Sequence, residues 1–271
     1  MKVAAIQMVS GVDRDANLAQ AHALLAQAAH AGAELALLPE YFCIMGRTDG
    51  DKHALREPYG DGPVQRFLAA AAREFGLWLI GGTLPLACAD PARVRNATLV
   101  HDPEGACVAR YDKVHLFGFD RDDEHFDEAR TIARGSAPVR FAFDARAGEH
   151  WRVGLSICYD LRFPELYRAQ ARAGADLLVV PSAFTWTTGR AHWEVLLRAR
   201  AIENQAYVLA AAQGGVHENG RRTWGHSMLV SPWGEVLAER DEGAGLVLAD
   251  VSAHRLAEVR RQLPALGHRV L

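Results

Sequence analysis

The stretch "VGLSICYDLRFPELYRAQARAG", residues 153–174, contains the transition that decides the fold. An apolar run ends at Cys158, a polar turn follows, and Pro164 begins a helical segment. In α/β folds, reactive side chains often lie at such strand–turn–helix junctions, at the carboxyl end of a strand. Cys158 is therefore a candidate nucleophile. Because free cysteines are commonly buried and inert, a packed thiol is an equally good interpretation of this stretch alone.

The same alternation of strands and helices extends along the rest of the chain. Residues 15–33, 63–76, 164–174, 190–205 and 252–263 have helical patterns, with Ser252 placed to cap the last helix. Strands are predicted at 2–8, 34–42, 77–86, 95–105, 107–117, 138–144, 151–158, 175–182, 206–213, 225–232, 234–240 and 245–251. The polar and acidic segment 118–135 is predicted to be a loop.

The predicted strands are too apolar to face water. Both faces of each sheet must therefore be covered by helices or by another sheet. No linker, repeat or low-complexity tract interrupts the chain. We expect an α/β protein in which residues 1–271 form a single domain.

Composition excludes several classes of partner. The 271 residues carry a formal net charge of -3 with no basic block, so we expect no binding to nucleic acid or to membranes. The apolar run near the start is too short for a signal peptide or a spanning helix, which favours a cytoplasmic location. No two cysteines form a C-x-x-C pair, and none is spaced from histidines as zinc ligands are. We therefore expect free thiols and no metal site. These cysteines are Cys43, Cys88, Cys107 and Cys158.

Two further residues occupy positions typical of a reactive site. Glu40 directly follows a buried strand in "LALLPEYF", and Lys113 lies in the apolar and aromatic context "YDKVHLFGF". Taken alone, each is better explained as an ordinary solvated acid or an edge-strand lysine. Together with Cys158 they supply a base, a cation and a nucleophile, the groups needed to attack a carbonyl or nitrile carbon.

Three motifs give the chain a specific resemblance. "LLPEYF" (37–42), "YDKVHLF" (111–117) and "ICYDLRFPELYR" (157–168) resemble, in order, the signature regions of the nitrilase superfamily, the carbon–nitrogen hydrolases. Residues 181–213 and 224–239 are similar to that family as well. The resemblance implies a four-layer α-β-β-α sandwich, usually assembled as a homodimer or higher homo-oligomer.

The resemblance also implies roles for individual residues. Cys158 would be the nucleophile, Glu40 the general base, and Lys113 the oxyanion-binding group together with the backbone N–H of Tyr159. A second site glutamate is expected after the lysine. Glu128 matches best because of its distance to the glycine that ends the loop, and Glu124 is the rival. No cofactor is implied.

Other residues near the motifs have less certain roles. Tyr41, Phe117, Phe184 and Trp186 are candidate pocket walls, with core packing as the alternative. His115, His192 and His226 suggest a Cys–His protease, but we favour structural hydrogen bonding because the resembled site uses glutamate. Asp160, Arg162 and Glu165 are expected to pair locally and brace the turn. Arg162 is alternatively a ligand for a substrate carboxylate.

Within the family, the sequence of residues 187–213 and 223–239 most resembles the branch of omega-amidases and deaminated glutathione amidases. The predicted function is hydrolysis of a small carboxylate-bearing amide to an acid and ammonia through a Cys158 thioester. A nitrilase or N-carbamoyl hydrolase with the same site is one alternative. A non-catalytic interaction protein on the same scaffold is another, although it would not require Glu40, Lys113 and Cys158 together.

Overall fold

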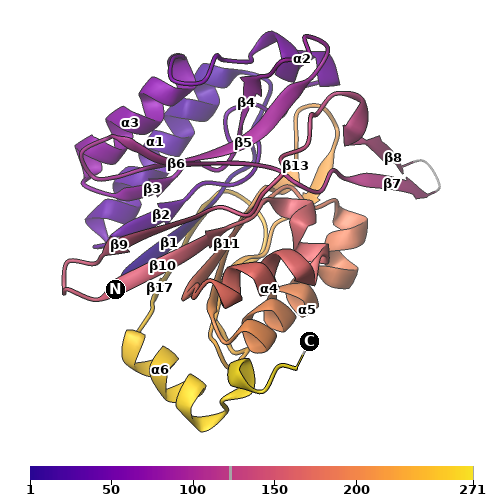
Figure 1. The fold of residues 1–271 in the computed structure, drawn as a ribbon. Coiled ribbons are helices and arrows are strands. Elements are labelled where there is room, and N and C mark those ends of the chain that lie inside the picture. The colour runs from indigo at the N-terminus through magenta and orange to yellow at the C-terminus, as the bar shows by residue number, and fades with distance from the viewer. Residues whose placement is uncertain (122–123, 271) are drawn as a thin grey trace.

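The fold consists of two β-sheets packed face to face, with helices on both outer sides (Figure 1). The structure is a computed structural model that describes residues 1–121 and 124–270. Its α-helices are α1 (Arg14–His30), α2 (Asp49–Ala54), α3 (Pro63–Phe75), α4 (Pro164–Arg172), α5 (Trp186–Asn204) and α6 (Ala253–Gln262). Short 3₁₀ helices are η1 (Glu128–Arg130), η2 (Cys158–Arg162) and η3 (Ala265–Gly267).

The first sheet has the strand order β17-β1-β2-β3-β5-β4, with β6 paired to β5. Strands β1, β2 and β3 are parallel, and β17 joins β1 antiparallel so that Lys2 pairs with Asp250. Its strands are β1 (Lys2–Gln7), β2 (Leu35–Leu37), β3 (Trp78–Ile80), β4 (Leu84–Ala87), β5 (Val94–His101), β6 (Cys107–Asp112) and β17 (Gly245–Asp250).

The second sheet has the order β16-β15-β12-β11-β10-β9, with β10, β11 and β12 parallel. Its strands are β9 (Arg140–Asp144), β10 (His150–Leu155), β11 (Leu177–Ser182), β12 (Tyr207–Ala212), β15 (Ser227–Val230) and β16 (Val236–Arg240). Two small hairpins, β7 (Gly118–Arg121) with β8 (Glu124–Asp127) and β13 (Gly214–Val216) with β14 (Arg222–Trp224), lie outside both sheets.

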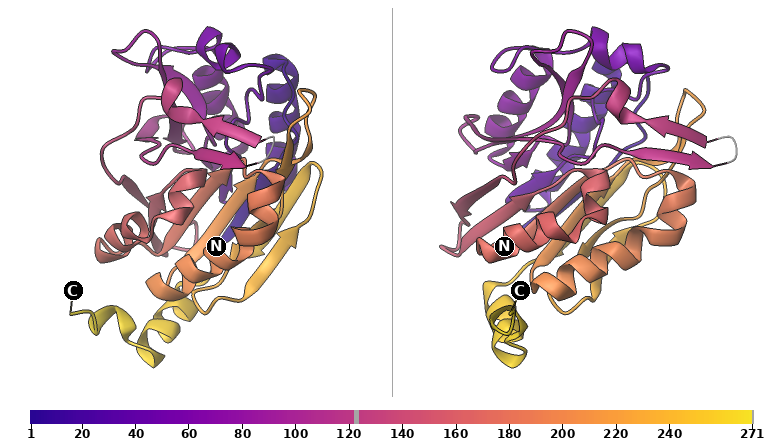
Figure 2. Two further views of the ribbon diagram at one scale, coloured as in Figure 1. Left: turned by 90° about the vertical axis from the view of Figure 1, so that its right-hand side faces the viewer. Right: turned by 45° about the vertical axis from the view of Figure 1, so that its right-hand side comes forward.

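The two-residue period of the strands separates two hydrophobic layers. In β1, Val3 and Ala5 belong to the core cluster shared with the second sheet, whereas Ala4 and Ile6 pack into the cluster formed with α1 and α3. Side chains of successive strand residues point to opposite faces, so a strand buried on both faces must be apolar throughout. Helices α4 and α5 cover the outer face of the second sheet (Figure 2). The predicted α-β-β-α sandwich is confirmed.

Local sequence signals account for many element ends. Pro63 begins α3, and Gly76 ends it in a left-handed conformation with φ 59°. The Ser252 hydroxyl caps α6 by accepting a hydrogen bond from the Arg255 amide at 3.2 Å.

Several sequence-based expectations need correction. The strand predicted over 77–86 is divided at Gly81 and Gly82 into β3 and β4, because Gly82 adopts a left-handed turn with φ 52°. The predicted loop 118–135 contains the hairpin β7–β8 and the helix η1. The strands of this hairpin could not be predicted because their sequence is polar and charged. The hairpin projects from the body of the fold and contributes no buried face (Figure 2).

Within residues 1–121 and 124–270, no helix combines the length and the apolarity needed to cross a membrane. The single-domain organisation stays a prediction.

Candidate active site

Cys158 lies at the first position of η2, directly after the parallel strand β10 and the connecting residues 156–157. Its backbone is left-handed, with φ 48°. A non-glycine residue in this region costs on the order of 1–3 kcal/mol, and such residues cluster at functional sites. Tyr41, beside Glu40, also has a positive φ of 56°. Both strained residues line the same pocket.

Asp160 holds the turn that presents Cys158. Its fully buried carboxylate accepts hydrogen bonds from the Ile157 amide at 2.9 Å and the Tyr111 hydroxyl at 2.7 Å. The other carboxylate oxygen accepts from the His115 amide at 3.0 Å and lies 2.7 Å from His115 Nδ1. Asp160 thereby fixes two chain segments to the turn. One is the end of β6 and the residues after it, which include Lys113, and the other is the residue before Cys158.

Lys113 lies between two carboxylates. Its Nζ is 2.9 Å from Oε1 of Glu40 and 2.8 Å from Oε2 of Glu128, and its side chain is 1% exposed. Charges this buried are tolerated when they are paired and hydrogen-bonded. The structure therefore brings together all four residues predicted to be catalytic, since Cys158 lines one pocket with Glu40, Lys113 and Glu128.

Each carboxylate is oriented by further donors. Glu40 accepts from Asn96 Nδ2 at 2.9 Å and from the Ala183 amide at 3.0 Å. Glu128 accepts from the Tyr41 hydroxyl and from the Phe117 amide, both at 2.8 Å. Glu124, the rival second glutamate, lies in β8, and its side chain is outside the part of the chain that the structure describes.

The charges set the protonation states of the site. Burial opposes the charge of Lys113, but Glu128 and Glu40 outweigh it and raise the lysine pKa well above its ordinary value. Burial would raise the pKa of Glu128, whereas Lys113 and the Phe117 amide lower it overall. Burial, followed by the Glu40 charge, raises the pKa of Cys158 well above that of a free thiol. The resting nucleophile is therefore a thiol, with Glu40 beside it in the pocket.

A pocket with about 340 Å³ of empty space opens onto these groups. Tyr41, Phe117, Tyr159 and Phe184, predicted as substrate-contacting residues, all line it. Trp186, another predicted wall, is absent from the lining and packs edge-to-face on Trp224. The remaining lining residues are Arg162, Ala183, Thr185, Thr188 and Arg221, besides the four charged or nucleophilic groups.

Local pairing of the turn residues differs from the prediction. Asp160 braces the turn, but Arg162 instead contacts His192 Nδ1 at 3.2 Å and faces the rings of Tyr159 and Phe184. Glu165 is exposed, in the first turn of α4. The turn is fixed from β6 and the residues after it, because Tyr111 and His115 donate to the buried Asp160 carboxylate.

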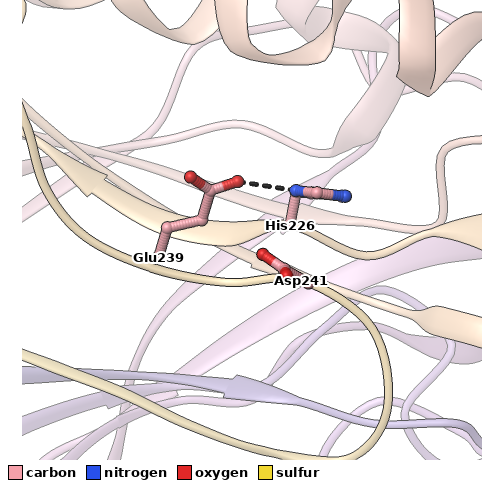
Figure 3. Close-up of side chains that lie close together, drawn as sticks. All are labelled: His226, Glu239 and Asp241. Atoms are coloured by element: carbon pink, nitrogen blue, oxygen red, sulfur yellow. Dashed lines mark hydrogen bonds and ion pairs between the residues drawn. The ribbon is translucent and has the colours of Figure 1, made fainter.

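Histidines play structural parts around the site. His115 contacts Asp160, and His192 contacts Arg162, as described above. His226 Nδ1 lies 2.6 Å from Glu239, with Asp241 beside it (Figure 3). The His226 amide also donates to the Asp241 carbonyl at 2.7 Å. These contacts support the expectation of hydrogen-bonding roles.

The comparisons with known proteins identify the family. The model of the carbon–nitrogen hydrolase family matches residues 2–261. The chain belongs to the carbon–nitrogen hydrolases. The predicted family and enzyme class are thereby confirmed.

Relatives match this carbon–nitrogen hydrolase along almost its whole length. A deaminated glutathione amidase from Synechocystis sp. is 42% identical, covering 98% of this chain and 97% of the relative. Omega-amidase NIT2 from Pongo abelii is 38% identical, with 97% and 92% covered. The crystal structure of Saccharomyces cerevisiae Nit3, a member of branch 10 of the nitrilase superfamily, superposes with a TM-score of 0.88 at 29% identity, covering 100% and 97%.

Sequence reasoning missed several contributors to the site of this hydrolase, among them Ala183, whose amide donates to Glu40, and Thr185 in the pocket lining. Asn96 orients Glu40 from the middle of β5, and Thr188 and Arg221 line the pocket from α5 and from the turn before β14. Asn96 is a buried polar residue inside an apolar strand, which is a recognisable signal. Arg221 has no comparable signal because its position depends on how the β13–β14 hairpin folds over the pocket.

Proposed function

We propose that this carbon–nitrogen hydrolase is an amidase that cleaves a small carboxylate-bearing amide through a Cys158 thioester. The observation that carries the proposal is the arrangement of Cys158, Glu40 and Lys113 in one buried pocket. The names of the relatives, deaminated glutathione amidase and omega-amidase, support amides of this kind as substrates.

In the first half of the reaction, Glu40 takes the proton from Cys158 as sulfur attacks the amide carbon. A nearby base is required because the Cys158 thiol has a raised pKa. Negative charge develops on the amide oxygen, where Lys113 and the backbone N–H of Tyr159 stabilise it. The Tyr159 amide suits this role because it lies in the first turn of η2, where N–H groups lack partners inside the helix.

In the second half, Glu40 returns the proton to the departing nitrogen and the C–N bond breaks, leaving a thioester. Water then attacks the thioester carbon, with Glu40 accepting its proton. The C–S bond breaks, the acid is released, and Cys158 regains its proton from Glu40. Glu128 orients Lys113 through its 2.8 Å contact and balances the charge of the lysine throughout.

The charges around the pocket favour an anionic substrate. Lys113 is neutralised by its two glutamates, whereas Arg162 and Arg221 also line the pocket. Within the described residues, neither arginine forms an ion pair with a carboxylate. A guanidinium matches the geometry of a carboxylate, so each is suited to bind an acidic group of the substrate.

We also propose that the protein forms a homodimer through α5. Val195 is 68% exposed and Ile202 is 49% exposed, and their spacing of seven residues places them on one helix face. Trp233 is 50% exposed and precedes Gly234, which packs near Ile202. Contiguous exposed apolar residues are typical of protein interfaces. Light scattering on wild type and Val195→Glu would test this, with a monomeric variant supporting it and an unchanged mass contradicting it.

The activity is tested with a panel of 2-oxoglutaramate, 2-oxosuccinamate, deaminated glutathione, a simple aliphatic amide, a nitrile and an N-carbamoyl amino acid. Wild type and Cys158→Ala are compared, and Cys88→Ala is the matched control because Cys88 is a free cysteine that does not line the pocket. Turnover of the carboxylate-bearing amides that Cys158→Ala abolishes supports the proposal. Activity on the nitrile or carbamoyl substrate alone would overturn the substrate class and keep the nucleophile.

A further inference from the structure

The two carboxylate oxygens of Glu40 have different hydrogen-bond partners. Oε1 accepts from Lys113 Nζ and from Asn96 Nδ2, both at 2.9 Å, whereas Oε2 accepts from the Ala183 amide at 3.0 Å. A carboxylate offers about four lone-pair positions, shared equally by its two oxygens. Apart from the nucleophile, donors within residues 1–121 and 124–270 therefore fill both positions on Oε1 and leave one open on Oε2.

This difference distinguishes the oxygens as proton acceptors. A base can take the Cys158 proton only on an oxygen with a free lone pair. Oε2 meets this condition, and its donor Ala183 lines the pocket together with Glu40 and Cys158. Oε1 accepts from a cation and an amide at the same time, and hydrogen bonds of this kind favour the unprotonated carboxylate. The proton that Glu40 carries therefore belongs on Oε2.

Asn96 holds Oε1 from outside the pocket. The residue is 1% exposed, lies within β5, and is not part of the pocket lining. In the described part of the chain, its side chain makes a single hydrogen bond, the one to Glu40, and its buried Oδ1 has no partner. A buried amide oxygen without a donor disfavours the folded state. Packing of β5 therefore does not account for an asparagine here, whereas the contact with Glu40 does.

The main chain of Asn96 has a separate contact with the site. Its carbonyl oxygen accepts a hydrogen bond from the Lys113 amide at 3.0 Å. One residue of β5 thus holds the cation through its backbone and the base through its side chain. A substitution of the side chain removes the bond to Glu40 and keeps the backbone bond to Lys113, so the two contacts can be tested apart.

We propose that Asn96 is a positioning residue that keeps Oε1 of Glu40 occupied, so that Oε2 alone carries the proton during catalysis. This inference rests on the proposed function, in which Glu40 is the base. In the first half of the reaction the proton passes from sulfur to Oε2 and then to the departing nitrogen. In the second half it passes from water to Oε2 and back to sulfur. Without Asn96, Oε1 gains an open lone pair, and a proton held there faces Lys113 and not the reacting atoms.

Asn96→Leu tests the proposal because it removes both polar groups with little change in size. The kcat for the best amide substrate should fall about ten- to hundredfold, the range for losing a hydrogen bond to a charged group. KM should stay within about twofold of wild type, because Asn96 does not line the pocket. The ratio of kcat in H₂O to kcat in D₂O should rise, because proton transfer by Glu40 becomes the slow step.

A second variant, Asn96→Asp, keeps the shape of the side chain. It places an acceptor oxygen where Nδ2 now donates to Glu40, so its kcat should fall further than that of Asn96→Leu. Circular dichroism shows whether each variant has the fold of wild type. A kcat equal to that of wild type in a folded Asn96→Asp would overturn the proposal by itself.

Asn204→Leu is the matched control. Asn204 is also fully buried, its Oδ1 also lacks a partner among the described residues, and its Nδ2 donates to the Arg200 carbonyl at 2.9 Å. It makes no contact with Glu40 and does not line the pocket. The same change of residue should therefore lower stability in urea denaturation but leave kcat and the H₂O-to-D₂O ratio unchanged. Glu40→Gln is measured beside both variants.

The outcomes separate this inference from the proposed function. A normal kcat in Asn96→Leu with an inactive Glu40→Gln would overturn the positioning role and keep Glu40 as the base. Equal losses of kcat in Asn96→Leu and Asn204→Leu would also overturn it, since lost stability would explain both. A raised KM with an unchanged isotope ratio would do the same. An active Glu40→Gln would overturn the proposed function, and this inference with it.

Discussion

Glu40 and Asp160 are two buried carboxylates that the fold treats differently. Both are less than 2% exposed, and both are within the reach of Cys158 or its turn. Asp160 is surrounded by hydrogen-bond donors from Tyr111, His115 and Ile157, and it does not line the pocket. Glu40 lines the pocket, and its neighbours there include the thiol that must lose a proton.

The difference shows how one residue type serves two purposes. A carboxylate whose oxygens accept hydrogen bonds from separate segments holds those segments together. A carboxylate that keeps contact with an accessible thiol can exchange a proton with it. Burial alone does not distinguish Asp160 from Glu40, since both are buried. They differ because only Glu40 lines the pocket where a substrate fits.

The largest expected effect comes from Glu40→Gln. A carboxamide cannot accept the Cys158 proton, so kcat for the best amide substrate should fall by at least about a thousandfold. The fold should persist, because Lys113 keeps its contact with Glu128. Steady-state kinetics and circular dichroism measure the two quantities. Activity within tenfold of wild type would remove Glu40 from the role of base.

Asp160→Asn should affect stability first. The carboxamide places an N–H₂ group against one of the donors that Asp160 now satisfies, which costs about 1–3 kcal/mol of unfolding free energy. Turnover should fall as well, because the turn carrying Cys158 loses its anchor. Urea denaturation, with Asp144→Asn on the exposed end of β9 as control, tests this. Lost activity at unchanged stability would show a direct catalytic role.

A sharper contrast is expected in the reactivity of Cys158 toward iodoacetamide. The Glu40 charge helps to raise the pKa of the thiol, and Lys113 opposes it. Glu40→Gln should therefore lower the pKa, and each unit increases the thiolate fraction at neutral pH about tenfold. We expect faster alkylation in the variant that has lost amide turnover. Mass spectrometry of the modified cysteine measures the rate of alkylation. Slower alkylation in Glu40→Gln would contradict this prediction and show that Glu40 activates the thiol toward every electrophile.

The smallest effect concerns acid stability. The pKa of Glu128 is lowered in the fold, so its charge stabilises the native state above the pKa of an unfolded glutamate, about 4.3. This contribution disappears as pH falls through the lowered folded pKa. The stability difference between wild type and Glu128→Gln should therefore be largest at neutral pH and shrink in acid. A difference that grows in acid would reverse the assigned direction of the shift.

Much of this picture follows from local sequence. The positions of Glu40, Lys113 and Cys158 at or near strand ends could be predicted because apolar strands end visibly in polar residues. The spacing to Gly135 favours Glu128 over Glu124, and the structure places Glu128 against Lys113.

Other features depend on contacts between distant segments. Asn96 and Glu40 are far apart in sequence, and nothing local pairs their side chains at 2.9 Å. The hairpin β7–β8 has a polar, charged sequence because neither of its faces enters the core, so hydrophobic alternation could not reveal it. Arg221 reaches the pocket only when β13 and β14 pair.

The pairing of β17 with β1 has a consequence for how the protein acquires its shape during synthesis. Strand β1 is made long before its neighbour β17 (Gly245–Asp250), so this pair of strands cannot form until that distant segment has been synthesised. Until then, β1 presents an uncovered backbone edge that can pair with another nascent chain. Contacts between such distant segments slow folding. Pairing of the β1 edge with other chains, and aggregation through it, is therefore a hazard of this topology until β17 has been added.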